Sequence, residues 1–253
     1  MCYSWRKERG EIMSIIAFIN QKGGVGKSIL SFNIGAYLAS IGKKILFVDL
    51  DAQATLTDLT IPNEEYQLSL NDVLYNKSIK VQDAIVHTDK YDVLPSIINM
   101  ANIDSKLKKD SLDKVLDPLR RQYDYIILDC PPALGMMNIA ALYATDKVIS
   151  VIKPDIVSTR GLTLLNQTII NEVPGKTINA VIINQYKKRK ISELTAQLMK
   201  QEYPVLLDTL VRDTSVLSES ASISQSVVDY AKNSNGYQDI EDVTKELLAK
   251  GII

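Results

Sequence analysis

The sequence has few of the side chains that bind metals or act as nucleophiles. It contains two cysteines, Cys2 and Cys130, and one histidine, His87, in 253 residues. Two cysteines so far apart predict neither a disulfide framework nor a cysteine metal site, and they favour a reducing, cytoplasmic compartment. Iron–sulfur chemistry, which needs several cysteine ligands, is disfavoured for the same reason. A lone histidine followed by Thr88 and Asp89 is typical of a surface loop, so histidine-based catalysis is not expected.

Charge imbalance and long apolar runs are also missing. The chain carries 29 basic and 30 acidic residues, so any binding to nucleic acid must come from a local patch. No apolar run approaches the about 18 residues that a membrane span requires. Residues 1–12 are charged and lack an apolar stretch, so we predict an extension or a misannotated start before Met13 rather than a secretory signal. The 46% apolar content is ample for one domain over residues 13–253.

A glycine-rich segment follows the first apolar run of the chain. Such a turn between a buried strand and a helix directs several backbone N–H groups into one concavity, which suits a polyphosphate. Lys27 is then expected to reach the β- and γ-phosphates, and the Ser28 hydroxyl to bind Mg²⁺. The standard P-loop pattern has a glycine where this chain has Gln21, and Lys22 is an additional cation. The residues of the segment are Lys22, Gly23, Gly24, Val25, Gly26, Lys27 and Ser28.

Short apolar runs alternate with longer helical patterns along the whole chain. Several runs are continuously apolar, as expected for parallel strands that are buried on both faces. The alternation predicts an α/β fold, a doubly wound and mostly parallel sheet flanked by helices, with the ligand site at the carboxyl edge of the strands. The predicted strands are Ile15–Asn20, Lys44–Asp49, Asp92–Leu94, Tyr125–Asp129, Val148–Lys153, Ile178–Asn184 and Val205–Leu207. The predicted helices are Lys27–Ser40, Leu70–Tyr75, Ser105–Arg121, Met136–Ala144, Thr159–Asn171, Ser192–Glu202 and Thr214–Ala221.

Acidic residues end two of the predicted strands. Asp49 and Asp51 are two residues apart on an extended segment, so their side chains are expected to point to the same side. Both are then expected to face a metal ion and the γ-phosphate. Asp129 ends a buried run and is followed by Pro131 and Pro132. A carboxylate in that place beside a P-loop binds Mg²⁺, usually through a water molecule.

These segments resemble the motifs of one protein superfamily. The glycine-rich segment resembles the deviant Walker A motif (K-G-G-x-G-K-S/T) of the ParA/MinD superfamily. Lys43–Gln53 is similar to its D-x-D-P-Q signature, although Ala52 and Ala54 replace the usual proline and glycine. Tyr123–Pro132 resembles its Walker B strand. The resemblance implies a P-loop NTPase fold and a slow, Mg²⁺-dependent hydrolysis of ATP that a partner stimulates.

The resemblance also implies roles for individual residues. Lys22 is implied to cross a dimer interface to the phosphates of the partner subunit, so that hydrolysis requires an ATP-dependent homodimer. Asp51 is implied to position or deprotonate the attacking water, and Asp49 to support Mg²⁺ through a water or Ser28. Asn184 either contacts adenine or forms a turn. The implied sets are Lys22, Lys27 and Asp51 for catalysis; Gly23, Gly24, Val25, Gly26, Lys27, Ser28, Ile29, Asn184 and Arg212 for the nucleotide; and Ser28, Asp49 and Asp129 for the metal.

Branches of the superfamily differ in their targets. A MinD-like protein would end in a basic amphipathic membrane helix, whereas residues 243–253 are short and of mixed charge. We expect these residues to form the terminal turn of a docked helix. Metabolic relatives would need a substrate pocket or cluster cysteines. The chain is similar to the small ParA-type partition ATPases from about residue 14 to 248, with further matches at Ser69–Leu74, Asp92–Ser96 and Tyr230–Tyr237. There is no room before the P-loop for a helix-turn-helix domain.

A basic cluster follows Asn184 and opens a predicted helix. In the ParA branch this region, together with Arg212, is implied to bind DNA non-specifically. Adjacent cations neutralise phosphates without reading bases, which gives a salt-dependent interaction. A solvated charged turn is the alternative explanation. The cluster consists of Lys187, Lys188, Arg189 and Lys190.

We therefore expect an ATPase that segregates plasmid or chromosomal DNA. It is expected to be cytoplasmic and nucleoid-associated, to bind DNA as an ATP-bound dimer, and to be released by a ParB-like centromere-binding protein, with no role for a membrane. One alternative is a MinD-like positioning ATPase whose cargo is a protein complex or a membrane. The other is a nucleotide switch that hydrolyses ATP only weakly.

Overall fold

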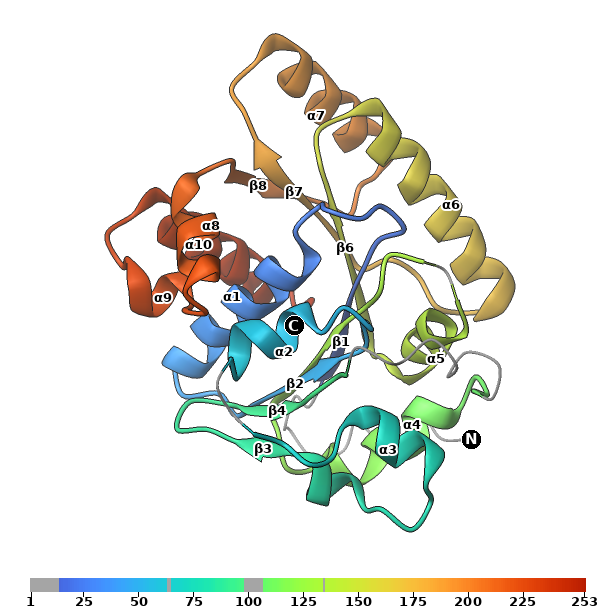
Figure 1. Ribbon diagram of the computed structural model, residues 1–253. Helices are drawn as coiled ribbons and strands as arrows, with labels where there is room; N and C mark the ends of the chain where they lie inside the picture. Colours follow the sequence, from blue (N-terminus) through green and yellow to red (C-terminus); the bar gives the residue numbers. More distant parts are fainter. Residues whose placement is uncertain (1–13, 63–64, 98–106, 134) are drawn as a thin grey trace.

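A single eight-stranded sheet forms the centre of the molecule. The computed structural model describes residues 14–62, 65–97, 107–133 and 135–253, and the predicted extension at residues 1–12 lies outside them. The strands follow the order β3-β4-β2-β5-β1-β6-β7-β8 (Figure 1). Each of the described pairings is parallel except that of β3 with β4. The strands are β1 (Ser14–Ile19), β2 (Ile45–Asp49), β3 (Val86–His87), β4 (Asp92–Leu94), β5 (Tyr125–Asp129), β6 (Lys147–Ile152), β7 (Ala180–Tyr186) and β8 (Leu206–Arg212).

Helices cover both faces of this sheet. The α-helices are α1 (Lys27–Ser40), α2 (Thr55–Thr60), α3 (Leu70–Tyr75), α4 (Ser111–Leu116), α5 (Met136–Ala144), α6 (Ile156–Glu172), α7 (Lys190–Glu202), α8 (Ser215–Ser222), α9 (Val227–Tyr230) and α10 (Asn235–Ala249). Short 3₁₀ turns occur at η2 (Val81–Ala84) and η4 (Asp117–Leu119). Figure 1 shows α8, α9 and α10 together at one side of the sheet and α6 and α7 at the other.

The side chains of β1 point alternately to the two faces of the sheet, and the core has a part on each face. Ile15, Ala17 and Ile19 join a buried apolar cluster with side chains of α3 to α7. Ile16 and Phe18 point the other way, into a cluster with α1, α2 and α8 to α10. A strand that is apolar on both sides can be buried only between two layers of helices. The predicted doubly wound α/β fold is therefore confirmed.

Most predicted elements are confirmed to within a few residues, and the exceptions have physical causes. The predicted helix over Ser105–Arg121 is wrong in length, because α4 ends at Leu116 and the chain continues as a 3₁₀ turn that contains Pro118. Proline lacks the N–H that would continue an α-helix. Strand β8 is longer than predicted, β3, α2 and α9 were missed, and only the last turn of α10 was predicted. The short elements contain too few residues for a period to be visible.

The C-terminal segment was predicted as the last turn of a docked helix, and it is the end of the long helix α10. Ser234 caps this helix by accepting a hydrogen bond from the Tyr237 amide (3.1 Å). Ile240, Val243 and Leu247 lie on one side of α10 and are buried in the core. The amphipathic pattern of α10 thus serves packing within the chain. Within the described ranges, none of the helices combines the length and the apolar character that crossing a bilayer demands.

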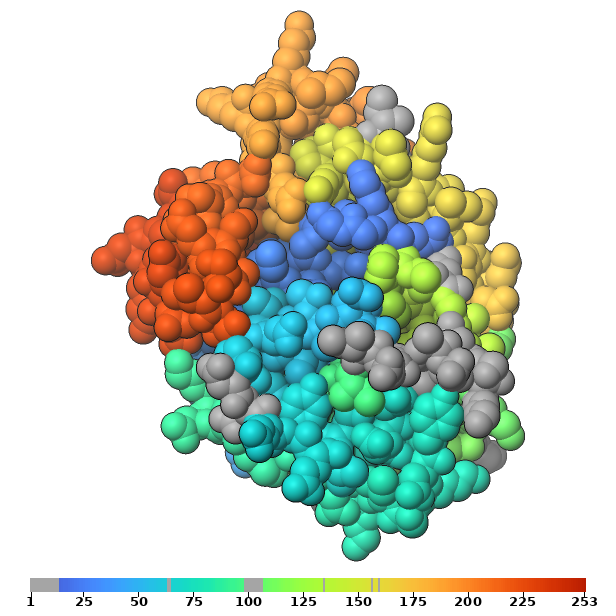
Figure 2. Space-filling model, viewed as in Figure 1, coloured from blue at the N-terminus to red at the C-terminus, as the bar shows by residue number. Residues whose placement is uncertain are grey.

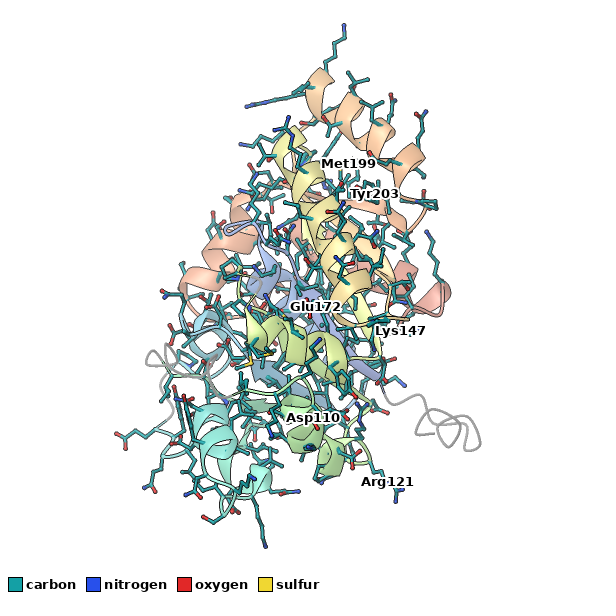
Figure 3. The ribbon with its side chains drawn as sticks, turned by 90° about the vertical axis from the view of Figure 1, so that its right-hand side faces the viewer. Asp110, Arg121, Lys147, Glu172, Met199 and Tyr203 are labelled. Atoms are coloured by element: carbon teal, nitrogen blue, oxygen red, sulfur yellow. The ribbon has the colours of Figure 1, made fainter. Side chains whose placement is uncertain are left out.

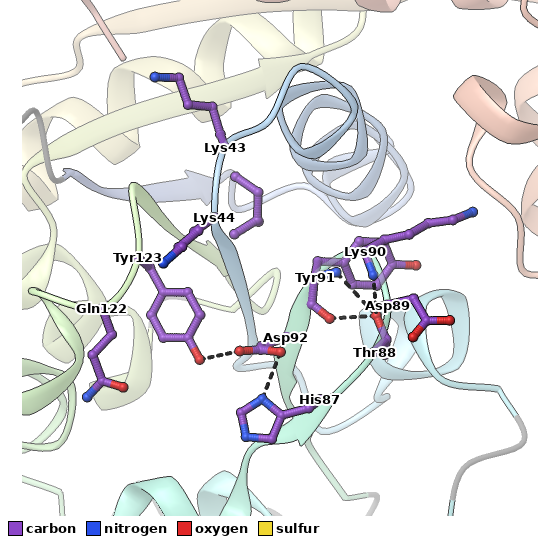
Figure 4. Close-up of a pocket in the computed structure, with 11 residues that line it drawn as sticks. Lys43, Lys44, His87, Thr88, Asp89, Lys90, Tyr91, Asp92, Gln122 and Tyr123 are labelled. Atoms are coloured by element: carbon purple, nitrogen blue, oxygen red, sulfur yellow. Dashed lines mark hydrogen bonds and ion pairs between the residues drawn. The ribbon is translucent and has the colours of Figure 1, made fainter.

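A hollow of about 370 Å³ opens at the amino edge of the sheet, away from the glycine-rich segment (Figure 4). His87 lies there, at the end of β3 rather than in the predicted loop, and its side chain is exposed as predicted. Its Nδ1 atom is 2.9 Å from an Asp92 carboxylate oxygen, and the Tyr123 hydroxyl donates to the other oxygen (2.5 Å). None of the residues predicted to bind nucleotide or metal lines this hollow.

The packing of α1 against the sheet generates a stability prediction. A Cβ atom on Gly35 would lie 2.4 Å from the Phe47 ring and 2.8 Å from Ile127 Cδ1. We expect Gly35→Ala to lower the free energy of unfolding by about 1–3 kcal/mol, because the buried ring would have to move. Urea denaturation measures the change. Gly161→Ala is the matched control: its added Cβ meets only Asn20 Oδ1, at 3.7 Å, and equal stability of the two variants would contradict the prediction.

Candidate nucleotide-binding site

The glycine-rich segment lies at the carboxyl edge of the sheet, between β1 and α1 near the sheet's centre. Gly24 (φ 70°) and Gly26 (φ 91°) adopt left-handed backbone conformations that other residues rarely tolerate. Gly26 precedes the first turn of α1 and provides no side-chain cap. The first N–H groups of α1 therefore remain available for an anion, which the positive end of the helix also attracts.

Two asparagines hold this loop in place. Asn20 follows β1; its Nδ2 donates to a β6 carbonyl (2.5 Å), and its Oδ1 accepts from the Lys22 amide (2.9 Å). Asn184 on β7 donates to the carbonyl of Val25 (2.8 Å). A Cβ atom on Gly26 would lie 2.2 Å from Asn184 Nδ2, so this glycine is required by the asparagine as well as by its φ angle. Asn20 was not among the predicted site residues, and its role is signalled only by an amide side chain immediately after a buried strand.

The two predicted metal carboxylates are neighbours. Strands β2 and β5 pair in register so that Asp49 lies opposite Asp129, and both side chains are fully buried. Asp49 accepts hydrogen bonds from the Asp51 amide (3.0 Å), the Thr57 amide (2.9 Å) and the Thr57 hydroxyl (2.8 Å). Burial raises the pKa of Asp49 to about 6, and these hydrogen bonds act against the rise. Three of about four acceptor sites of the carboxylate are thus used inside the protein.

Asp129 has no such support. Neither of its carboxylate oxygens has a hydrogen-bond partner among the described residues. Burial raises its pKa to about 8, the Asp49 carboxylate adds to the rise, and nearby Ser28 and Lys27 lower it. A buried carboxylate without partners is costly unless a cation or a proton neutralises it. The site therefore favours a positively charged ligand at Asp129.

The residues at this edge fit Mg²⁺, provided that phosphate and water complete its coordination. In the part of the chain that the structure describes, no three His, Cys, Asp or Glu side chains gather around one point. Mg²⁺ bound to nucleotides typically takes one or two protein oxygens and fills its shell with phosphate and water. Ser28 and the unpartnered oxygens of Asp129 suit that arrangement. Their assignment as metal ligands stays a prediction, as does that of Asp49.

The remaining predicted catalytic residues surround the loop. Lys27 is the first residue of α1 and is largely buried. Asp51 is half-buried after β2; its Oδ1 accepts from the Gln53 amide (3.0 Å). The side chain of Lys22 reaches the start of α6, where its Nζ lies 2.8 Å from a carboxylate oxygen of Asp155. Asp155 was not among the predicted site residues, although an aspartate three residues before Ser158 is a typical helix cap.

The predicted base and DNA contacts of Arg212 meet a different environment. Its Nε and Nη2 atoms bind the Asp239 carboxylate at 2.9 and 2.5 Å. This ion pair occupies most of the guanidinium and neutralises its charge. The nucleotide and DNA roles of Arg212 therefore stay predictions, as does the contact of Asn184 with adenine.

The fold and the loop together define a P-loop nucleotide-binding protein. Residues 13–183 match the family model described as AAA domain. The sporulation initiation inhibitor protein Soj of Bacillus subtilis is 33% identical over 255 residues, which cover 94% of this chain and 99% of Soj. With this agreement in motifs, coverage and identity, the chain belongs to the ParA/MinD superfamily of P-loop ATPases.

Solved structures agree with this assignment. A plasmid partition protein from Borrelia burgdorferi superposes with a TM-score of 0.79 at 21% identity, covering 94% of this chain and 98% of that chain. The septum site-determining protein MinD of Pyrococcus horikoshii, in complex with Mg-ADP, gives a TM-score of 0.79 at 26% identity, with coverages of 95% and 98%. The first comparison shows the shared fold, and the second shows a relative that binds nucleotide with magnesium.

The support of Asp49 generates a prediction. Thr57→Val keeps the side-chain shape but removes a hydrogen bond to Asp49 and the acceptor of the Ser96 amide (3.0 Å). We expect a loss of about 1–3 kcal/mol in the free energy of unfolding at neutral pH. Chemical denaturation measures it, with the exposed Thr55→Val as the control.

The same variant has an expected pH dependence. The pKa of Asp49 is already raised to about 6, and losing a hydrogen bond that favours the carboxylate raises it further. The extra cost is present when Asp49 is charged and disappears as the pH falls through that pKa. The deficit is therefore expected to be smaller at about pH 5 than at about pH 8. A deficit that does not change with pH would mean that only the Ser96 contact matters.

Proposed function

We propose that this chain is a Mg²⁺-dependent ATPase that hydrolyses ATP to ADP and phosphate as a nucleotide sandwich dimer and acts in DNA partition. The observation that supports the proposal is that the two lysines of the loop, Lys22 and Lys27, have different surroundings. Lys27 is buried at the start of α1, whereas the Nζ atom of Lys22 lies against Asp155 at the start of α6. A cation in that position suits phosphates that a second copy of the chain presents.

The chemistry requires positioning and charge stabilisation. The α1 amides and Lys27 bind the phosphates, and Asp51 orients the attacking water. When bound, Mg²⁺ neutralises charge on the phosphate oxygens beside Ser28 and Asp129. The Lys22 of a second copy supplies the remaining cation, in the manner of an arginine finger, which is worth roughly 10³–10⁵ in rate. Hydrolysis is then coupled to dimerisation.

The DNA target is supported by the position of the basic cluster at residues 187–190. Residues 187–189 connect β7 to α7, Lys190 is the first residue of α7, and all four are exposed. Lys187 pairs with Asp213 (2.8 Å), while Lys188, Arg189 and Lys190 have no ion-pair partner within the described ranges. Figure 2 shows the segment that includes this cluster and α7 projecting from the body of the molecule. Unpaired, projecting cations suit the phosphate backbone of DNA. A ParB-like partner and nucleoid association rest on family membership alone.

The dimer mechanism predicts a separation of binding from hydrolysis. Lys22→Ala is expected to bind ATP with near-normal affinity but to lose most ATPase activity and ATP-dependent dimerisation. Phosphate release and sedimentation with a non-hydrolysable ATP analogue measure the two properties. Asp51→Ala is the comparison variant, expected to bind and dimerise without hydrolysing. Full hydrolysis by Lys22→Ala would refute the role of Lys22 across the dimer interface.

The DNA proposal predicts an effect confined to one surface. The double variant Lys188→Glu and Arg189→Glu is expected to lose ATP-dependent binding to random duplex DNA while keeping its ATP affinity. Fluorescence anisotropy at several salt concentrations measures the binding and its salt slope. Lys77→Glu with Lys80→Glu makes the same charge change beside α3 and is expected to bind nearly normally. Retained DNA binding by the first variant would exclude this cluster, and ATP-dependent binding to liposomes instead would favour the MinD-like alternative.

A further inference from the structure

Lys22 is held at both ends within its own chain. Its backbone amide donates to Asn20 Oδ1 (2.9 Å), which fixes the base of the side chain. Its Nζ lies 2.8 and 3.1 Å from the two carboxylate oxygens of Asp155 and 3.4 Å from the Ser158 hydroxyl. The ammonium that is proposed to serve a second copy is therefore occupied in the single chain.

Asp155 is itself fixed independently of Lys22. It caps α6, and its Oδ1 accepts a hydrogen bond from the Ser158 amide (2.7 Å). Partial burial raises the pKa of Asp155, but hydrogen bonds from Lys22 and Ser158 outweigh it and lower the pKa below its usual value. The start of a helix also favours a negative charge. Asp155 is thus an ionised, preorganised counter-ion that remains in place when Lys22 leaves.

We propose that Asp155 is a positioning residue that holds Lys22 in cis and competes with the phosphates of a second copy for the lysine. This inference rests on the proposed function, because it concerns how the dimer forms. The Lys22 ammonium cannot stay against the Asp155 carboxylate and also reach the phosphates that a second copy binds across an interface. Opening of the Lys22–Asp155 ion pair is then a step of dimerisation.

The exposure of the pair sets the expected size of the effect. The side chains of Lys22 and Asp155 are 31% and 40% exposed. Ion pairs that are this accessible to water are worth little, about 0.2–1 kcal/mol, which corresponds to no more than about fivefold in an equilibrium constant. The contact therefore adjusts the concentration at which dimers form and does not block them.

Asp155→Asn separates the charge from the helix cap, since asparagine caps helices as well as aspartate does. With Mg²⁺ and a non-hydrolysable ATP analogue, we expect its dimer dissociation constant to be about two- to fivefold lower than that of the unaltered chain. Sedimentation velocity measures it at about 0.01 M and about 0.15 M ionic strength. The advantage is expected to shrink at the higher value, because salt screens an exposed ion pair. If the substitution only altered the structure of α6, its effect on the dimer dissociation constant would not shrink with rising salt.

Two further variants serve as controls. Asp155→Glu keeps the charge and is expected to restore a dissociation constant close to that of the unaltered chain. Asp208→Asn removes one carboxylate from an exposed ion-pair group with Lys200 and Lys250 and is expected to leave dimerisation unchanged. Dimerisation of Asp155→Asn that is equal to or weaker than that of the unaltered chain at low ionic strength would overturn the inference.

A measurement without nucleotide tests the contact by itself. The rate at which an amine-acylating reagent modifies Lys22 is determined by peptide mass spectrometry, with the exposed Lys43 as the internal reference. We expect Asp155→Asn to raise the rate at Lys22 relative to Lys43. An unchanged rate would overturn the cis contact. An unaltered chain that stays monomeric with nucleotide would contradict the proposed function instead, so the two failures are distinguishable.

Discussion

Two buried carboxylates side by side at the carboxyl edge of the sheet constrain everything around them. The register of β2 and β5 places Asp49 opposite Asp129, away from water. Like charges in such a place repel each other and lack hydration, so each needs compensation. The protein compensates Asp49 internally, with three hydrogen bonds from Asp51 and Thr57. Among the residues that the structure describes, neither oxygen of Asp129 has a hydrogen-bond partner, which is the environment that a bound cation would neutralise.

The difference between Asp49 and Asp129 explains which parts of the site the sequence could predict. Asp49, Asp51 and Asp129 stand at the ends of strands whose apolar runs are unmistakable, and the two neighbouring strands bring Asp49 and Asp129 together. Thr57 could not be predicted, because it lies on the six-residue helix α2 and reaches Asp49 only through tertiary folding. Strong periodic patterns predict elements, whereas a supporting side chain is defined by its contact alone.

The same distinction holds on the other side of the loop. The glycine-rich segment predicted α1 to the residue, because the loop's pattern and the helix start coincide. The partners of side chains that make contacts across the sheet could not be predicted. Asn184 was expected at adenine or in a turn, and it donates to the carbonyl of Val25 in the loop. Asp155, 133 residues from Lys22 in the sequence, is its ion-pair partner. The packing of α7 on α6 was not predictable either. Met199 and Tyr203 lie where the two helices approach each other (Figure 3), and the Tyr203 hydroxyl forms a hydrogen bond with the Thr163 hydroxyl (2.8 Å).

Strand β7 links the nucleotide loop to the surface proposed to bind DNA. Asn184 holds the loop from the end of this strand, and the exposed cations begin only three residues later, at Lys187. Between them Gln185 has a left-handed backbone (φ 55°), an uncommon conformation for a residue with a side chain. Lys187 forms an ion pair with Asp213, the residue that follows β8. Only Gln185 and Tyr186 therefore separate the residue that holds the loop from the first cation of the surface proposed to bind DNA.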